Sequence, residues 1–204
     1  MRRLLLDGLN KLNLDEGLAD SLLAYLLLLQ KWNKAYNLTA IRDPHDMVVL
    51  HLLDSLTVLP YLRGTAVLDV GTGAGLPGIP LAIAHPDVAF TLLDTNGKKT
   101  RFIEYAVRQL GLANVRVEKS RIEEYAPPDK FTTIVSRAFS SLDAFARVCH
   151  PLLRTDGYLL AMKGKLPKEE IDALNKAQWE VSSQPVDVPG LDAERHMVMM
   201  GPLS

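Results

Sequence analysis

The chain has 204 residues, which is enough for one well-packed domain with an extension. Its 48% hydrophobic and 23% charged residues are ordinary for a globular protein, and the net charge of −1 excludes binding to nucleic acid through overall charge. The single cysteine, Cys149, excludes an internal disulfide and a zinc site built from several cysteines. No signal peptide is visible, and the apolar run from Leu22 to Leu29 is too short to span a bilayer. We therefore expect a soluble, cytoplasmic protein that uses no metal and contacts no membrane.

The first 62 residues have a helical pattern, and we expect them to form an extension to a domain at residues 63–204. Asp15 can cap a helix that continues to about Tyr36. Leucines recur at helical spacing on one stripe of this helix, at positions 18, 22, 26 and 29. The segment from Trp32 to Thr39 then leads away from it.

A second helix should begin at Asp43 and Pro44, because aspartate caps helices and proline fits the first helical position. This helix carries His51, Asp54 and Ser55, and His51 and Ser55 share a face because they are four residues apart. The plainer interpretation is a histidine with its hydrogen bonds satisfied on an ordinary polar face. The alternative is that His51 or Asp54 enters a catalytic site from the extension.

From residue 66 onward, short apolar runs alternate with helical patterns, which is typical of a mostly parallel sheet with helices on both faces. Strands are expected at residues 67–70, 90–93, 115–118, 132–135, 158–162, 179–188 and 196–200. After the helix that follows the first strand, further helices are expected at residues 98–110, 142–153 and 167–178. The sequence therefore predicts a seven-stranded, Rossmann-like α/β domain. Ligands in such folds bind at the carboxyl ends of the strands, so residues far apart in sequence should meet at one edge.

The stretch from Val67 to Ala82, VLDVGTGAGLPGIPLA, predicts a strand, a glycine turn and a helix. At such a turn we expect backbone N–H groups to point outward and a ligand to come close. The dinucleotide spacing G-x-G-x-x-G fits from Gly73, so the glycines alone leave the ligand open. Asp69 gives instead D-x-G-x-G-x-G, the pattern of S-adenosylmethionine (SAM) sites, and a carboxylate suits the positive charge of that cofactor. A turn that merely packs a helix on a strand is the plainest alternative.

Two further strand ends bear on the chemistry. Asp94 ends the second strand 23 residues after Gly71, close to the spacing of roughly 20 at which an acid binds ribose hydroxyls. After the fourth strand, where amino-group methylases carry an N/D-P-P-Y/F box, the chain has Ser136-Arg137-Ala138-Phe139 and no carboxylate. A nucleophile that must lose a proton needs a base, whereas a ring nitrogen with a free lone pair, such as guanine N7, needs none. We therefore predict no catalytic side chain.

A group of basic residues should adjoin the same edge. The helix after Asp94 carries basic side chains on one face, and residues 95–137 hold nine Lys or Arg against five Asp or Glu. A solvated helix surface is the plain interpretation, but convergence at the cofactor mouth favours an RNA substrate. The candidate RNA contacts are Lys98, Arg101, Lys163 and Lys165.

Together these motifs resemble the RsmG (GidB) family of SAM-dependent methyltransferases of bacterial small-subunit ribosomal RNA. The resemblance covers nearly the whole chain and rests on LDVGTGAGLPGIPLA, LLDTNGKK, the segment at residues 136–139, W-N-x-x-Y-N-L-T and H-x-x-D-S. It implies methylation at N7 of guanine 527 in 16S rRNA, in agreement with the missing base. It also implies cofactor contacts by motif, which with Gly73 of the glycine turn are Gly71, Gly73, Leu76, Asp94, Ile122, Glu123 and Arg137.

Two other functions remain to be weighed. An NAD-type oxidoreductase is disfavoured by Asp69 and by the lack of evident hydride-transfer residues. A non-catalytic RNA-binding or assembly protein would differ from the methyltransferase only in turnover. The expected partner is 16S rRNA in the small ribosomal subunit or its assembly intermediate, and we expect a monomer.

Overall fold

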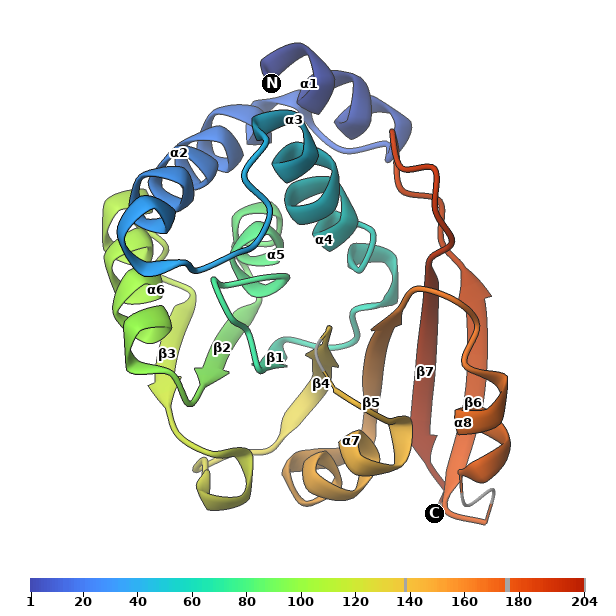
Figure 1. Cartoon of the computed structure of the whole chain (residues 1–204). Helices are drawn as coiled ribbons and strands as arrows, with labels where there is room; N and C mark the ends of the chain where they lie inside the picture. The colour runs from blue at the N-terminus through green and yellow to red at the C-terminus, as the bar shows by residue number, and fades with distance from the viewer. Residues whose placement is uncertain (138, 175–176, 204) are drawn as a thin grey trace.

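A seven-stranded sheet forms the centre of the computed structural model (Figure 1). The structure describes residues 1–137, 139–174 and 177–203. The strands are β1 (Ala66–Val70), β2 (Ala89–Asp94), β3 (Val115–Lys119), β4 (Phe131–Ser136), β5 (Leu153–Lys163), β6 (Trp179–Pro185) and β7 (His196–Pro202). Their order is β3-β2-β1-β4-β5-β7-β6, in which β1 to β5 are parallel and β7 runs antiparallel to both its neighbours. The predicted fold class is confirmed.

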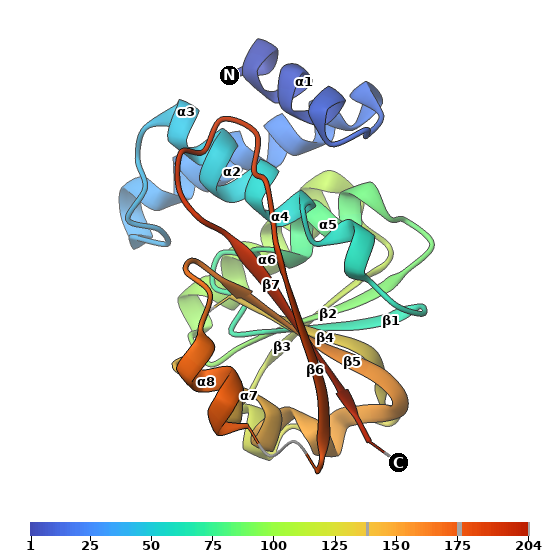
Figure 2. The same ribbon diagram turned by 90° about the vertical axis from the view of Figure 1, so that its right-hand side faces the viewer.

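Helices cover both faces of this sheet (Figure 2). The α-helices are α1 (Arg2–Lys11), α2 (Ala19–Tyr36), α3 (Pro44–Met47), α4 (Asp54–Leu56), α5 (Gly78–Ala84), α6 (Gly97–Leu110), α7 (Leu142–Cys149) and α8 (Lys168–Ala173). A π-helical stretch, Val48–Leu53, makes α3 and α4 continuous, and short 3-10 turns lie at Glu16–Leu18, Leu59–Tyr61, Ile122–Glu124 and His150–Leu152. In Figure 2, α1 to α6 lie above the sheet, and α7 and α8 lie below it. Within the described residues, no helix is long and apolar enough to cross a membrane.

Four predicted boundaries are wrong. The strand predicted at residues 158–162 is longer than expected, since β5 begins at Leu153. The helix predicted at residues 142–153 ends at Cys149, because Pro151 cannot continue an α-helix, and β5 begins at Leu153. The helix predicted at residues 167–178 ends at Ala173, since Leu174 turns to an extended conformation with ψ 142°; its positions 175 and 176 lie outside the described residues. The strand predicted at residues 179–188 ends as β6 at Pro185, although the Val186 N–H still donates to the Arg195 carbonyl at 2.8 Å.

Asp15 and Asp43, the two residues predicted to cap helices in the extension, both act as N-caps. Asp15 accepts a hydrogen bond from the Gly17 N–H at 2.9 Å, although it caps a 3-10 turn that leads into α2 rather than α2 itself. Asp43 accepts from the N–H groups of His45 and Asp46 at 2.8 and 3.1 Å, with Pro44 at the first helical position as expected. These caps set where the two helices begin and so fix the course of the chain between them.

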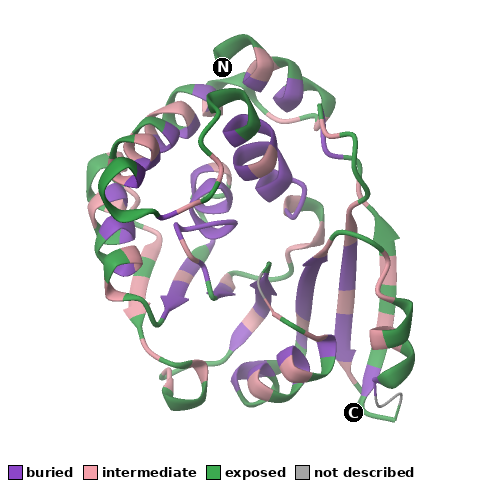
Figure 3. Ribbon diagram, in the orientation of Figure 1, coloured by how far each residue is buried: buried purple, intermediate pink, exposed green. Residues whose placement is uncertain are grey.

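The extension shares one hydrophobic core with α5, α6 and the sheet. The leucines at positions 22, 26 and 29 are fully buried in the same cluster as Phe102 of α6 and Ile79 of α5. Figure 3 shows the buried faces of α2, α4 and α5 turned toward one another. The fully buried Tyr25 donates a hydrogen bond to the carbonyl of Ala74 at 2.8 Å. The predicted boundary between residues 62 and 63 therefore separates two sets of elements that are packed on one another.

Tyr25→Phe should lower the free energy of unfolding by about 1 kcal/mol, because the buried Ala74 carbonyl loses a donor. The measurement is urea denaturation followed by circular dichroism. Tyr61→Phe is the matched control, since its hydroxyl makes only a long 3.4 Å contact with Gln184 at the surface. Equal stabilities for the two variants would contradict the link between the extension and the glycine turn.

Candidate functional site

The parallel strands end at one edge of the sheet, as predicted. Val70 of β1 pairs with Leu93 of β2, and Leu93 pairs with Glu118 of β3, so these three strands end at nearly the same level. Gly71 follows β1 directly, and Asp94 is the last residue of β2. This register brings the glycine turn, the acid and the turn after β3 together, although they are far apart in the sequence.

A cavity of about 510 Å³ opens at this edge. Of the predicted cofactor contacts, four line its walls: Gly71, Asp94, Ile122 and Glu123. Ser120 and Arg121, in the turn expected at this edge, also line the cavity, although they were not predicted as contacts. The lining residues that sequence reasoning missed include Thr95, Lys99 and Ser140. Lys99 follows Lys98, a predicted RNA contact, on α6, and the helix places the Lys99 side chain in the cavity lining. A helical wheel of α6 would have shown that Lys98 and Lys99 point in different directions.

The N–H groups of the glycine turn point into the protein, which corrects the expectation that they point outward. Those of Gly71 and Thr72 donate to the Leu93 carbonyl at 2.9 and 3.1 Å. That of Gly73 donates to the Asp94 carboxylate at 2.9 Å. These donors are thus already used, and the turn does not present them to a pyrophosphate. Gly71 and Gly73 have φ of 69° and 64°, a region that glycine enters without strain.

Asp69 braces the turn from beneath. Its fully buried carboxylate accepts hydrogen bonds from the Thr72 hydroxyl at 2.6 Å and the Gly78 N–H at 2.8 Å. Burial raises the pKa of this carboxyl to about 6, against the effect of these two hydrogen bonds. Asp69 does not line the cavity, so the structure assigns it the shape of the turn rather than direct contact with a charged cofactor.

Asp94 presents a fixed carboxylate to the cavity. It is 8% exposed, and its oxygens accept from the N–H groups of Gly73 and Asn96 at 2.9 and 2.8 Å. A carboxylate has about four acceptor positions, so it retains lone pairs for the hydroxyl groups of a ligand. The predicted position of an acid at the rim is confirmed, and the two backbone donors hold it there.

Three other predicted contacts lie beside the cavity rather than in its lining. Leu76 is 3% exposed and packs into the hydrophobic core. A Cβ built on Gly73 would meet nothing closer than 3.9 Å, so it would enter open space close to the Lys99 ammonium. Arg137, just after β4, donates a hydrogen bond to the Leu50 carbonyl at 3.1 Å, and Ala138 of the same motif lies outside the described residues.

A buried polar cluster joins the extension to this edge. Asp54 accepts from the Arg195 guanidinium at 3.1 Å and lies 3.7 Å from that of Arg137. Burial raises the pKa of the Asp54 carboxyl, and the two arginines oppose this shift. The Asp54 side chain is only 5% exposed and does not line the cavity. This acid is therefore engaged as an ion-pair partner and is not positioned as a base.

His51 lies in the same cluster with 2% exposure. Its Nε2 is 3.0 Å from the Thr39 hydroxyl, and its Nδ1 is buried. Burial, and secondarily the charge of Arg137, lowers the pKa of His51 to about 4. The histidine is therefore neutral and buried, but the plainer interpretation of a histidine with its hydrogen bonds satisfied is only half right, since Nδ1 has no hydrogen-bond partner among the described residues. Within the described part of the chain, no cluster of three or more His, Cys, Asp or Glu residues could hold a metal ion.

The candidate RNA contacts differ in whether their charged groups are exposed to solvent or held in an ion pair. Lys98 and Arg101 lie exposed in the first turns of α6, and Lys165 is exposed after β5. The ammonium of Lys163 lies 2.9 and 3.1 Å from the two carboxylate oxygens of Glu170, and its side chain is only 15% exposed. The first three charges thus face solvent, whereas that of Lys163 is held in an ion pair.

His51→Gln should flatten the loss of stability between pH 6.5 and pH 4. The pKa of His51 is about 4 in the folded protein and about 6.5 in an unfolded chain, so the unfolded state takes up the proton first. Stability is therefore lost as pH falls through this window, by at most ~3 kcal/mol.

Urea titrations at pH 7 and pH 4.5 measure this difference between wild type and variant. Asp69, with its pKa raised to about 6, acts in the opposite direction in both proteins, and its contribution cancels in the comparison. His45→Gln removes an exposed histidine of the same extension and should leave the profile unchanged. A His51→Gln profile identical to that of wild type would contradict the assignment.

Comparison with known proteins identifies the family. Residues 18–198 match the family described as GidB, rRNA small subunit methyltransferase G. The chain is 50% identical over 187 residues to ribosomal RNA small subunit methyltransferase G of Alkalilimnicola ehrlichii, covering 92% of this chain and 85% of the relative. It is 53% identical over 199 residues to the protein of that name from Marinobacter nauticus, covering 95% and 92%.

Solved structures agree on the fold. A SAM-dependent methyltransferase from Aquifex aeolicus matches with a TM-score of 0.59 and 25% identity, covering 78% of this chain and 93% of that one. A putative O-methyltransferase from Klebsiella pneumoniae matches in fold with a TM-score of 0.61 and 11% identity, covering 88% and 90%. With the sequence matches over most of its length, the chain belongs to the rRNA small subunit methyltransferase G family.

Proposed function

We propose that this protein transfers the methyl group of SAM to N7 of guanine 527 in 16S rRNA. Membership of the family supports methylation of small-subunit rRNA. The single observation that carries the choice of N7 is that the candidate bases His51 and Asp54 are buried outside the cavity lining, while the carboxylates that the described residues place in the lining, Asp94 and Glu123, are the ones we assign to the cofactor.

The cavity residues fit SAM. Asp94 retains lone pairs for the two ribose hydroxyls, and Gly71 leaves room because it has no side chain. In the 3-10 turn after β3, Ile122 offers an apolar wall for the adenine ring and Glu123 an acceptor for its amino group. SAM, when bound, supplies a methyl group on a positively charged sulfur that is already activated for displacement.

What the protein itself must do in this reaction is to position the guanine base relative to the methyl group. Guanine N7 is a hydrogen-bond acceptor with an exposed lone pair, so it can form the new N–C bond without losing a proton. Asp54 then serves to hold Arg137 at the edge, and His51 contacts Thr39 within the extension, so neither has to remove a proton. The protein has to hold the base in line with the methyl group and exclude water from the cavity.

Charges around the mouth would position the RNA. We assign phosphate contacts to the exposed side chains of Lys98, Arg101 and Lys165, with Lys163 joining them if its pair with Glu170 opens. Arg137 is one-third exposed and is anchored by Asp54, and we assign it to the end of the cofactor site where the methyl group is transferred. Leu76 would contribute through the shape of the turn, since its side chain is in the core.

The test of this function is the mapping of 7-methylguanine in small-subunit rRNA incubated with SAM, with and without the protein. Reduction and strand cleavage at 7-methylguanine reads each position directly. We expect one new site, at guanine 527. A site elsewhere would overturn the position, and RNA binding without any methylation would favour the non-catalytic alternative.

Glu123→Ala should weaken SAM binding by roughly 10- to 100-fold, as expected for the loss of one hydrogen bond to a charged group. Glu124→Ala is the matched control, because this neighbouring acid has similar exposure in the same 3-10 turn but does not line the cavity. Titration calorimetry with both folded variants measures the affinities. Equal affinities would show that the adenine lies elsewhere.

The rate of a single turnover at saturating RNA should change by less than about twofold from pH 6.5 to pH 9, because no base needs to be deprotonated in this range. Rapid-quench measurement with labelled SAM gives the rate at each pH. A tenfold rise for each pH unit over part of this range would show that proton removal is required and that the absence of a placed base has been misread.

A further inference from the structure

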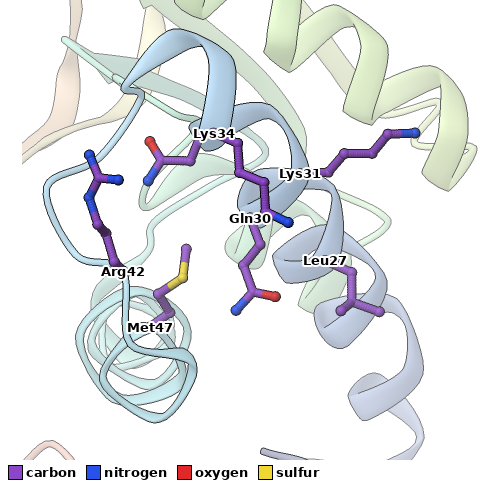
Figure 4. Close-up of a pocket in the computed structure, with 7 residues that line it drawn as sticks. Leu27, Gln30, Lys31, Lys34, Arg42 and Met47 are labelled. Atoms are coloured by element: carbon purple, nitrogen blue, oxygen red, sulfur yellow. The ribbon is translucent and has the colours of Figure 1, made fainter.

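We propose that the extension carries a second RNA-binding site, a basic hollow that holds phosphates of the RNA backbone away from the cofactor cavity. The hollow lies between α2 and the segment that enters α3 and has a volume of about 530 Å³ (Figure 4). Its lining shares no residue with that of the cofactor cavity. This inference rests on the proposed function in one respect, that the substrate is RNA.

Three basic residues line the hollow, Lys31 and Lys34 on α2 and Arg42 on the opposite wall. In Figure 4 the side chain of Lys31 extends away from Arg42. No carboxylate is among the lining residues. Lys31 and Lys34 are both exposed, and in the part of the chain that the structure describes neither has an ion-pair partner. The protein as a whole has a net charge of −1, so this is a local excess of positive charge.

The wall that carries Arg42 is fixed by hydrogen bonds. Asn33 donates its side-chain N–H to the Thr39 carbonyl at 3.0 Å and accepts from the Thr39 N–H at 2.9 Å. Asn37 takes the left-handed conformation, with φ 50°, that ends α2, and its side-chain oxygen accepts from the Arg42 guanidinium at 3.2 Å. The W-N-x-x-Y-N-L-T motif therefore builds a clamp that holds Arg42 across from the two lysines.

The remaining lining favours a polynucleotide. Leu27 is 55% exposed, and Met47 forms an apolar part of the wall, so a sugar or base can pack beside the charges. The cations stand on two separate walls, as suits successive phosphates of a strand rather than one compact anion. Two acids neighbour lining residues in the sequence, Asp43 beside Arg42 and Asp46 beside Met47, and neither is in the lining. The carboxylate of Asp43 accepts from the N–H groups of His45 and Asp46, and Asp46 is exposed.

The test compares two double variants of the full-length protein. Lys31→Ala/Lys34→Ala removes charges from the hollow, and Lys11→Ala/Lys130→Ala removes two exposed lysines elsewhere. We measure affinity for small-subunit rRNA over a series of salt concentrations. The hollow variant should bind at least about tenfold more weakly at 0.1 M salt, and its log–log salt slope should fall by roughly 0.7 to 0.9 for each lost phosphate contact. The control should stay within about twofold of wild type.

Methylation separates this proposal from the proposed function. The hollow variant should retain wild-type SAM affinity and a wild-type single-turnover rate at saturating RNA. If wild type methylates the RNA but both double variants bind it equally well, the hollow is not an RNA site. If wild type binds RNA without methylating it and only the hollow variant binds weakly, the hollow stands and the proposed function falls.

Two further measurements test the geometry. Asn37→Gly keeps the left-handed backbone but removes the acceptor for Arg42, so its loss of RNA affinity should be smaller than that of Arg42→Ala. Pyrophosphate titrated into the protein should bind only weakly, because one compact anion cannot reach both walls. Tight pyrophosphate binding that Lys31→Ala/Lys34→Ala abolishes, with RNA affinity unchanged, would assign the hollow to a small anion and overturn the proposal.

Discussion

The site depends on how the glycine turn is tied to the second strand. The carbonyl of Leu93 accepts two N–H groups from the turn, and the carboxylate of Asp94 accepts a third. Because Asp94 is also the acid at the cavity rim, the shape of the turn and the position of the acid cannot change independently. Asp69 supports the same turn from the core through Thr72 and Gly78, at the cost of burying a carboxyl whose pKa rises to about 6.

The helical extension is fastened to this unit at two places. The Tyr25 hydroxyl reaches the carbonyl of Ala74 inside the turn, and Asp54 lies between Arg137 after β4 and Arg195 before β7. The first contact is a buried hydrogen bond and the second a partly buried ion cluster, so both depend on geometry. An extension held in this way moves with the cavity rim, which is what a docking element for a large substrate requires.

Much of the fold could be predicted because the signals are local. Strand alternation, the Asp43 cap and the Gly111 helix end each depend on neighbours within a few residues. The end at Cys149 could have been predicted, because Pro151 is a local signal against a longer helix. The end at Ala173 goes with the burial of Leu174, where tertiary packing overrides helix propensity, and no periodicity reports it.

The cavity was predictable only in part, for a related reason. Topology alone placed Gly71 and Asp94 at one edge, because parallel strands end together. The inward N–H groups bond to Leu93 and Asp94 on another strand, a pairing that the spacing of the glycines does not encode. The partners of Asp69 and Lys163 lie only 3 to 9 residues away, but a residue pattern does not show which of these side chains turn toward each other.

If methyl transfer needs no catalytic base, the choice of nucleotide depends on how the RNA is positioned on the protein. With no proton to remove, any accessible guanine N7 is chemically competent, so choosing one base in a long RNA must come from docking. A net charge of −1 also means that general electrostatic attraction cannot supply that choice. Charges must then be concentrated at defined points. The RNA contacts that we propose lie on both the domain and the extension, at Lys98 and Lys31 among others, and two separate points fix an RNA more firmly than one cluster would. The hydrogen bond of Tyr25 to Ala74 and the ion cluster of Asp54 fasten the extension and so keep the distance between such points constant.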